Sequence, residues 1–71
     1  MPNERILVLE DHPELLNETS KVLTDAGYQV TSAGSGAQAI AHAHRIPFDL
    51  LVADVFLPDT TGIQVFQQIR A

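Results

Sequence analysis

Two short, continuously apolar runs, each ended by an acidic residue, constrain this chain most. Residues 6–9 precede Glu10 and Asp11, and residues 50–53 precede Asp54. Such runs are typical of strands that are buried on both faces, as in a parallel sheet. A carboxylate at the end of a buried strand is costly unless it has a partner or a task. Ligands of open α/β sheets bind at the carboxyl ends of the strands, so these acidic residues are candidates for a site.

Between the apolar runs the pattern alternates between strand and helix. We expect strands at 5–9, 28–33 and 50–54, and helices at 13–26, 37–45 and from 62 to the end of the chain. Alternating strands and helices predict a parallel sheet with right-handed crossovers. The two strands that end in acidic residues should be neighbours, which gives the strand order 2-1-3. The second strand is less apolar, which favours a place at the edge of the sheet.

Local signals mark the ends of the helices. Pro13 suits the first turn of a helix, and Gly27 suits the position after its last turn. Ser35 lies three residues before Gln38, and Thr61 three residues before residue 64, also Gln. This spacing predicts a capping box at the start of the second and third helices.

Helical spacing also predicts which side chains are buried. Ile40 is the largest clear apolar anchor of the second helix, and the third helix should bury Ile63, Phe66 and Ile69. On the first helix the predicted inward face consists of Leu15, Leu16, Thr19, Val22, Leu23 and Ala26.

Composition excludes several classes of protein. With 71 residues we expect one small domain, and the absence of cysteine excludes disulfides and thiolate metal sites. A net charge of −5 argues against non-specific nucleic-acid binding. The apolar runs are too short to span a bilayer, and residues 1–5 do not resemble a signal peptide. We therefore expect no membrane association and a cytoplasmic location.

The acidic residues suit phosphoryl chemistry with a metal ion. Three carboxylates placed close together repel one another, and a hard divalent cation such as Mg²⁺ relieves this repulsion. Asp54 has apolar residues on both sides of it in the sequence and is the best candidate nucleophile. Its attack on a phosphoryl group would give an acyl phosphate, with the metal neutralising charge.

Simpler interpretations exist for each residue taken alone. An acidic pair between a strand and a helix is most often a capping device, and only its combination with Asp54 favours a site. His12 is expected to be solvated or to cap the first helix, with a transition-metal ligand as the alternative. His42 and His44 lie two positions apart on a helix and face different directions, which argues against a metal site there.

Two motifs resemble those of the receiver domain of two-component response regulators. They are residues 6–11, which end in Glu10-Asp11, and residues 54–62, in which Asp54 is followed by Pro58 and then by Gly62. The resemblance extends over essentially all 71 residues. It implies a flavodoxin-like (CheY-like) sheet and a signalling domain that is not a turnover enzyme.

The resemblance also implies roles for individual residues. Asp54 would accept a phosphoryl group from the phosphohistidine of a sensor histidine kinase or of a histidine phosphotransfer protein. Asp11 and Asp54 would ligate Mg²⁺ directly, Glu10 would act through a water molecule, and the backbone carbonyl of Phe56 would be a further ligand.

A complete receiver of this family has five strands and five helices, so residues 1–71 are expected to be a partial receiver without an output domain. The strands that carry the family's Ser/Thr and Lys are not among these residues, and we expect impaired phosphotransfer. The third strand, central in the complete fold, would be an exposed edge here. We therefore expect a homo-oligomer in which third strands pair or helices exchange, or else a fragment of a longer regulator.

Two other functions remain as alternatives. The first is a receiver-derived module for dimerisation or docking that works without phosphorylation. The second is a Mg²⁺-dependent phosphatase of the haloacid-dehalogenase type, in which an acidic residue follows the nucleophile by two positions. Phe56 occupies that position here and argues against the phosphatase.

Overall fold

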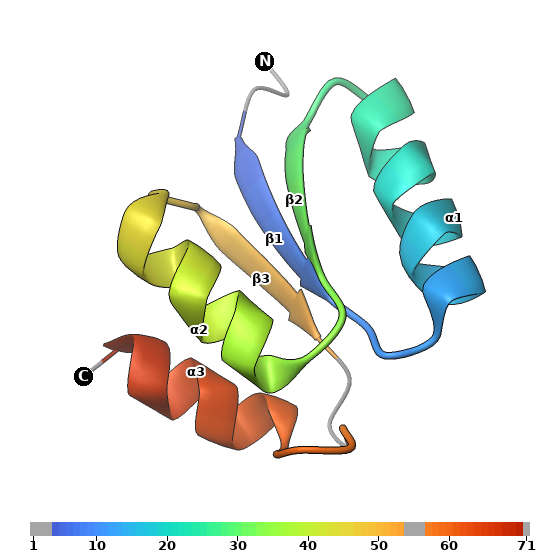
Figure 1. Ribbon diagram of the computed structural model, residues 1–71. Helices are drawn as coiled ribbons and strands as arrows, with labels where there is room; N and C mark the ends of the chain where they lie inside the picture. The colour runs from blue at the N-terminus through green and yellow to red at the C-terminus, as the bar shows by residue number, and fades with distance from the viewer. Residues whose placement is uncertain (1–3, 54–56, 71) are drawn as a thin grey trace.

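A parallel three-stranded sheet with helices on both faces forms the molecule (Figure 1). The structure is a computed structural model, which describes residues 4–53 and 57–70. The strand order is β2-β1-β3, which confirms the predicted order 2-1-3. Helix α1 lies on one side of the sheet, and α2 and α3 lie side by side on the other (Figure 1). The elements in chain order are β1 (Arg5–Leu9), α1 (Pro13–Asp25), β2 (Gln29–Ala33), α2 (Gly36–Arg45), β3 (Leu50–Ala53) and α3 (Gly62–Arg70).

The central strand β1 pairs with β2 from Arg5 to Leu9 and with β3 from Ile6 to Leu9. Leu7 is opposite Thr31 of β2 and Leu51 of β3, and Leu9 is opposite Ala33 and Ala53 by the same register. Residues 6–9 are all buried, as expected for an apolar run in the middle of a parallel sheet. The sequence pattern therefore identified the central strand correctly.

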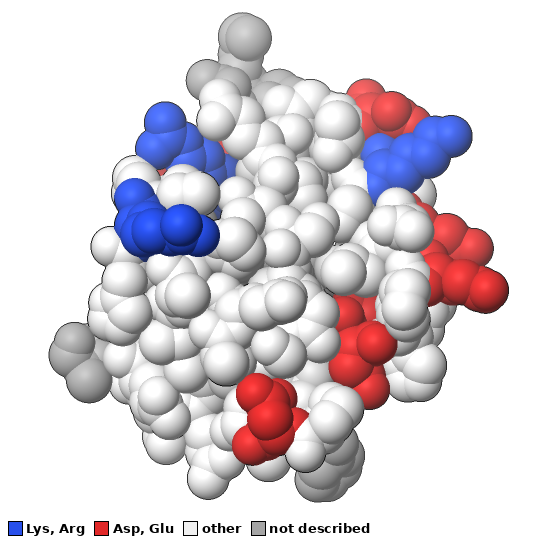
Figure 2. Space-filling view, viewed as in Figure 1, with Lys and Arg blue, Asp and Glu red and all other residues white. Residues whose placement is uncertain are grey.

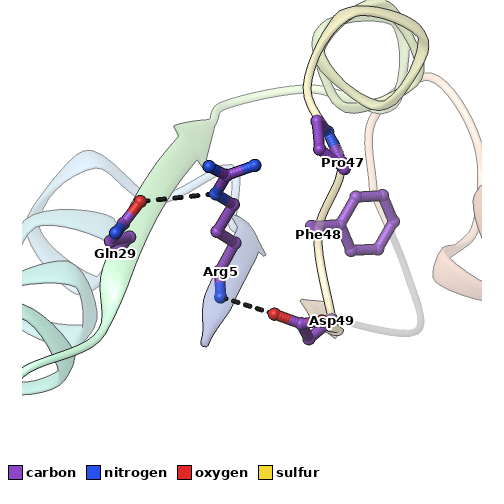
Figure 3. A pocket seen from close by; sticks show the side chains of 5 residues that line it. All are labelled: Arg5, Gln29, Pro47, Phe48 and Asp49. Carbon is purple, nitrogen blue, oxygen red and sulfur yellow. Dashed lines mark hydrogen bonds between the residues drawn. The ribbon is translucent and has the colours of Figure 1, made fainter. Parts of the chain in front are cut away.

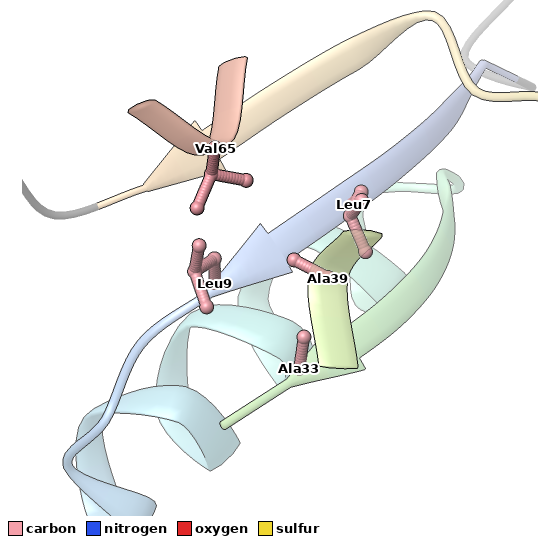
Figure 4. Packing of buried hydrophobic residues seen from close by; sticks show 5 residues of the cluster. All are labelled: Leu7, Leu9, Ala33, Ala39 and Val65. Atoms are coloured by element: carbon pink, nitrogen blue, oxygen red, sulfur yellow. The ribbon is translucent and has the colours of Figure 1, made fainter. Parts of the chain in front are cut away.

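Alternate residues of β1 point to opposite faces of the sheet. Leu7 and Leu9 pack with Ala33, Ala39 and Val65 in one buried cluster between the sheet and helices α2 and α3 (Figure 4). Ala39 and Val65 are completely buried. The small side chain of Ala39 lets the backbone of α2 approach the sheet closely.

The predicted inward face of α1 is partly wrong. Leu15 and Val22 are 50% and 67% exposed, and none of the residues of α1 is fully buried. Ala26 is exposed as well, whereas Leu16, Thr19 and Leu23 are half-buried, as predicted. Leu16 and Leu23 lie about 100° further around the helix than Leu15 and Val22. The apolar stripe is therefore wider than the face that the sheet covers.

The predicted inward face of α3 is also partly wrong. Ile63 and Phe66 are 58% and 46% exposed, whereas Val65, which the pattern did not single out, is completely buried. Ile69 packs against the buried cluster as predicted. Val65 and Ile69 are four residues apart and share one face, and this face rather than that of Ile63 and Phe66 meets α2.

The predicted signals at the helix ends are confirmed in part. In each predicted capping box the hydroxyl caps the helix, but Gln38 Oε1 accepts from the N–H of Gly34 and Gln64 Oε1 from the hydroxyl of Thr60. The Oγ atom of Ser35 accepts a hydrogen bond from the backbone N–H of Gln38 at 3.2 Å, and Thr61 Oγ1 accepts one from Gln64 at 3.1 Å. Gly27 follows α1 with a φ of 102°, a left-handed conformation that glycine adopts without steric cost.

At the amino ends of the strands, Arg5 and Asp49 join β1 to the start of β3 (Figure 3). The backbone N–H of Arg5 donates to Asp49 Oδ2 at 2.9 Å, and that of Asp49 donates to the Arg5 carbonyl at 2.7 Å. With Gln29, Pro47 and Phe48 they line a hollow of about 270 Å³. Among the described helices, none has the length and apolar character needed to cross a membrane.

Gly36 provides a test of the packing between α2 and the loop before α3. A Cβ atom at this position would lie 2.3 Å from Thr60 Cγ2, whereas one at Gly34 would meet nothing closer than 3.5 Å. We expect Gly36→Ala to lower the free energy of unfolding by about 1–3 kcal/mol because of overpacking. Urea denaturation measures this change in the free energy of unfolding.

Two further variants act as controls for this measurement. Gly34→Ala should change the unfolding free energy much less, and adding Thr60→Ser to Gly36→Ala removes the clashing methyl group and should restore most of the loss. Equal stability of the Gly36→Ala and Gly34→Ala variants would contradict the close packing.

Candidate functional site

Glu10 and Asp11 lie at the carboxyl end of the central strand, directly before α1. The backbone N–H of Glu10 donates to the carbonyl of Ala33 at 3.1 Å and so continues the pairing with β2. Glu10 is buried, with 8% of its surface exposed, and the side chain of Asp11 is 25% exposed. Both carboxylates are therefore held on rigid backbone, with the aspartate closer to solvent.

His12 joins this acidic pair. Its Nδ1 atom is 2.8 Å from Glu10 Oε1 and 3.3 Å from Asp11 Oδ1, and its backbone N–H donates to Glu10 Oε1 at 3.2 Å. The imidazole is 68% exposed, as expected for a solvated residue. His12 occupies the N-cap position of α1, but its side chain makes no capping hydrogen bond. Of the two expected roles, solvated or capping, the structure shows the solvated one.

The chemistry of these groups fits a hard cation. One ligand atom from each of Glu10, Asp11 and His12 lies within 4.8 Å of the others. Carboxylate oxygens are the ligands that Mg²⁺ prefers, and the ion commonly keeps several waters. The acidic pair therefore offers oxygen ligands of the kind that a hard cation takes.

Two of the predicted site residues, Asp54 and Phe56, lie outside the described residues. The structure describes β3, the strand that directly precedes Asp54 in the sequence. Ala53, the last residue of β3, is opposite Leu9, the last residue of β1. The residues that follow these two in the sequence are Asp54 and Glu10.

One carboxylate in the loop after β3 was missed by sequence reasoning. Asp59 Oδ1 accepts a hydrogen bond from the backbone N–H of Gly36, and Oδ2 accepts one from Ala37, both at 3.1 Å. The N–H of Gly36, and next that of Ala37, hold the pKa of the Asp59 carboxyl below its usual value. No local spacing could reveal this contact, because the partners are more than 20 residues apart.

Acidic and basic side chains are distributed unevenly over the surface. In Figure 2, Asp and Glu extend along the side of α1 and to the lower end of the molecule, toward which the strand arrows of Figure 1 point. Lys and Arg lie in the upper part of the same view. The candidate site is thus on the more acidic part of this face, where a cation is favoured.

Comparison with known proteins identifies the family. The model of the response regulator receiver domain matches residues 6–71. The transcriptional regulatory protein KdpE of Mycobacterium tuberculosis is 40% identical over 65 residues, which are 92% of this chain and 29% of KdpE. PhoP of Bacillus subtilis, an alkaline phosphatase synthesis transcriptional regulatory protein, is 37% identical over 96% of this chain and 28% of its own length. The chain thus spans under a third of these relatives.

Solved structures give the same answer. The chemotaxis response regulator CheY4 of Vibrio cholerae superposes with a TM-score of 0.90 at 32% identity, over 96% of this chain and 57% of CheY4. The response regulator TrrA of Thermotoga maritima, in complex with Mg²⁺-BeF, gives 0.87 at 30% identity, over 94% and 58% of the two chains. The order of strands, the fold and the sequence match agree, and the chain belongs to the family of response regulator receiver domains, which are signalling domains.

Proposed function

We propose that the chain accepts a phosphoryl group on Asp54 from a phosphohistidine, with Mg²⁺ as the cofactor. The donor would be a sensor histidine kinase or a histidine phosphotransfer protein. The observation that carries the proposal is the pairing of Leu9 with Ala53, because the acidic pair and Asp54 directly follow these two strand ends. The complex of the related TrrA with Mg²⁺-BeF supports the metal.

In this reaction a carboxylate oxygen of Asp54 forms a bond to phosphorus while the bond from phosphorus to the histidine nitrogen breaks. The imidazole leaves with the electron pair and takes up a proton. Asp11, Asp54 and the Phe56 carbonyl would hold Mg²⁺, with Glu10 acting through water. The ion supplies neutralising charge for the transferring group. The burial of Glu10 and its contact with His12 keep the acidic pair oriented.

The product would be a signal rather than a released metabolite. An acyl phosphate on Asp54 adds charge at the carboxyl edge of the sheet, and such charge can bias the position of neighbouring loops. The relatives are named as transcriptional regulators, and an output of that kind is part of the proposal. A cytoplasmic location and the absence of direct nucleic-acid binding by these 71 residues remain predictions.

Labelling of Asp54 tests the function directly. We expect acetyl phosphate with Mg²⁺ to add one phosphoryl group, detected by intact-mass spectrometry, and Asp54→Asn to abolish it. Asp25→Asn, at the far end of α1, is the matched control and should label normally. Label that persists in the Asp54→Asn variant would refute the assignment. The rate, compared with that of a longer parent chain, also tests the expected impairment.

Removal of Asp11 tests the metal site. We expect Asp11→Asn to weaken Mg²⁺ binding about tenfold or more, since even partners outside the ligand shell commonly contribute that much. The measurement is a titration followed by the amide signals of residues 9–12, with Mn²⁺ as a paramagnetic probe and Asp25→Asn as the control. Unchanged affinity in Asp11→Asn would place the ion elsewhere.

The docking module remains a second candidate because of the exposed edge of the sheet. β3 pairs with β1 on one side only in the described sheet, and its Leu50 and Val52 are 53% and 38% exposed. An apolar edge strand is a template for pairing with another chain. A second copy of this chain would cover it through a two-fold pairing of β3 with β3.

Sedimentation velocity tests this association. We expect the 71-residue chain to form dimers at micromolar concentration, and Val52→Lys to shift it toward monomer because a charge on an edge strand opposes pairing. Val22→Lys is the matched control, since Val22 is equally apolar and more exposed but lies on α1. A compact monomer at these concentrations would rule out the dimer.

A further inference from the structure

The loop between β3 and α3 is attached to the start of α2 by a carboxylate. Asp59 accepts hydrogen bonds from the first two backbone N–H groups of α2, those of Gly36 and Ala37, with one oxygen each. The third N–H, of Gln38, goes to Ser35. The first N–H groups of a helix have no partner within the helix. In α2 the local cap satisfies one of them, and a residue from a distant loop satisfies two.

The contact between loop and helix is close as well as polar. Gly36 has no side chain, and the space that a Cβ would occupy is taken by the methyl group of Thr60. The hydroxyl of Thr60 donates to Gln64 Oε1 of α3 at 2.7 Å. Asp59 and Thr60 therefore connect α2, the loop and the first turn of α3 into one packed unit.

This unit anchors one end of the segment that carries Asp54. On its amino side the segment continues from Ala53, which is paired with β1. On its carboxyl side it continues into Leu57, whose N–H donates to the carbonyl of Thr60 at 3.0 Å. Three residues, 54–56, therefore separate a paired strand from a loop that Asp59 attaches to α2.

We propose that Asp59 is a positioning residue for phosphoryl transfer. Its carboxylate accepts hydrogen bonds from the start of α2 and thereby fixes the loop that follows Asp54. The inference rests on the proposed function. A nucleophile whose flanking chain is fixed at both ends loses less conformational freedom on reaching the reactive geometry. The lowered pKa of Asp59 keeps the carboxylate ionised, and charged acceptors make the stronger hydrogen bonds.

The alternative is that Asp59 only caps α2 and contributes to stability alone. Three variants separate the two roles. Asp59→Ala removes both acceptors, Asp59→Asn keeps one carbonyl oxygen and replaces the other acceptor with a donor, and Asp25→Asn removes a carboxylate far from the loop.

The first measurement is the rate of Asp54 labelling by acetyl phosphate with Mg²⁺, corrected for the folded fraction from urea denaturation. We expect Asp59→Ala to slow labelling of the folded protein by about fivefold or more, because small misplacements of a reacting group have large effects. Asp59→Asn should be intermediate and Asp25→Asn unchanged. If Asp59→Ala does not fold, Asp59→Asn against wild type decides the question.

The second measurement is the ¹H–¹⁵N spectrum, which reports the hydrogen bonds between Asp59 and α2 directly and needs no phosphorylation. The amide protons of Gly36 and Ala37 should shift upfield in Asp59→Ala and remain unshifted in Asp25→Asn. Unshifted amides in Asp59→Ala would show that Asp59 does not accept these hydrogen bonds and would overturn the proposal.

The outcomes distinguish failure of the proposed function from failure of the positioning role of Asp59. If the wild-type chain takes up no label, the proposed function fails and the positioning role fails with it. If wild type and folded Asp59→Ala label at the same rate, the phosphoacceptor function stands and Asp59 is a cap only.

Discussion

The pairing of β1 with both of its neighbours is the interaction on which the rest of the structure depends. Because β1 is buried on both faces and hydrogen-bonded on both edges, it fixes the register of β2 and β3 and gives both helical layers a surface to cover. The same strand delivers Glu10 to a buried position at its carboxyl end. A polar group there is tolerated because His12 and the backbone supply partners.

The described half of the site is built almost entirely from backbone geometry. Glu10 is fixed by its pairing with Ala33, and the turn into α1 brings His12 back onto it. On the other side, α2 receives Asp59 at its first turn. Asp59 is therefore held by backbone N–H groups, whereas Glu10 is held by both the backbone N–H and the imidazole of His12. The carboxylates gathered at this edge of the sheet favour a cation there.

Much of the fold could be predicted from the sequence, because its signals are local. The apolar runs, Pro13, Gly27 and the two capping boxes identified each strand and helix. The buried faces of α1 and α3 were harder to predict. Leu15 and Val22 are as apolar as Leu16 and Leu23, and only the angle at which α1 meets the sheet decides between them.

The residues of the site likewise divide into those that the sequence could predict and those that it could not. Glu10 and Asp11 could be found because each directly follows a recognisable strand, and the match of motifs pointed to Asp54 and Phe56, which lie outside the described residues. Asp59 could not be found, because its partners belong to a helix that precedes it by more than 20 residues.

The contact between Asp59 and α2 also has a consequence for the order of folding. A ribosome completes α2 well before it adds residue 59, and until then two N–H groups of the first helical turn must bond to water. The start of α2 is therefore expected to fray in the nascent chain, because a short helix depends on tertiary contacts for its stability. The smallest segment that can close this turn begins near Ser35 and includes Asp59, so this half of the domain should fold as one cooperative unit rather than helix by helix.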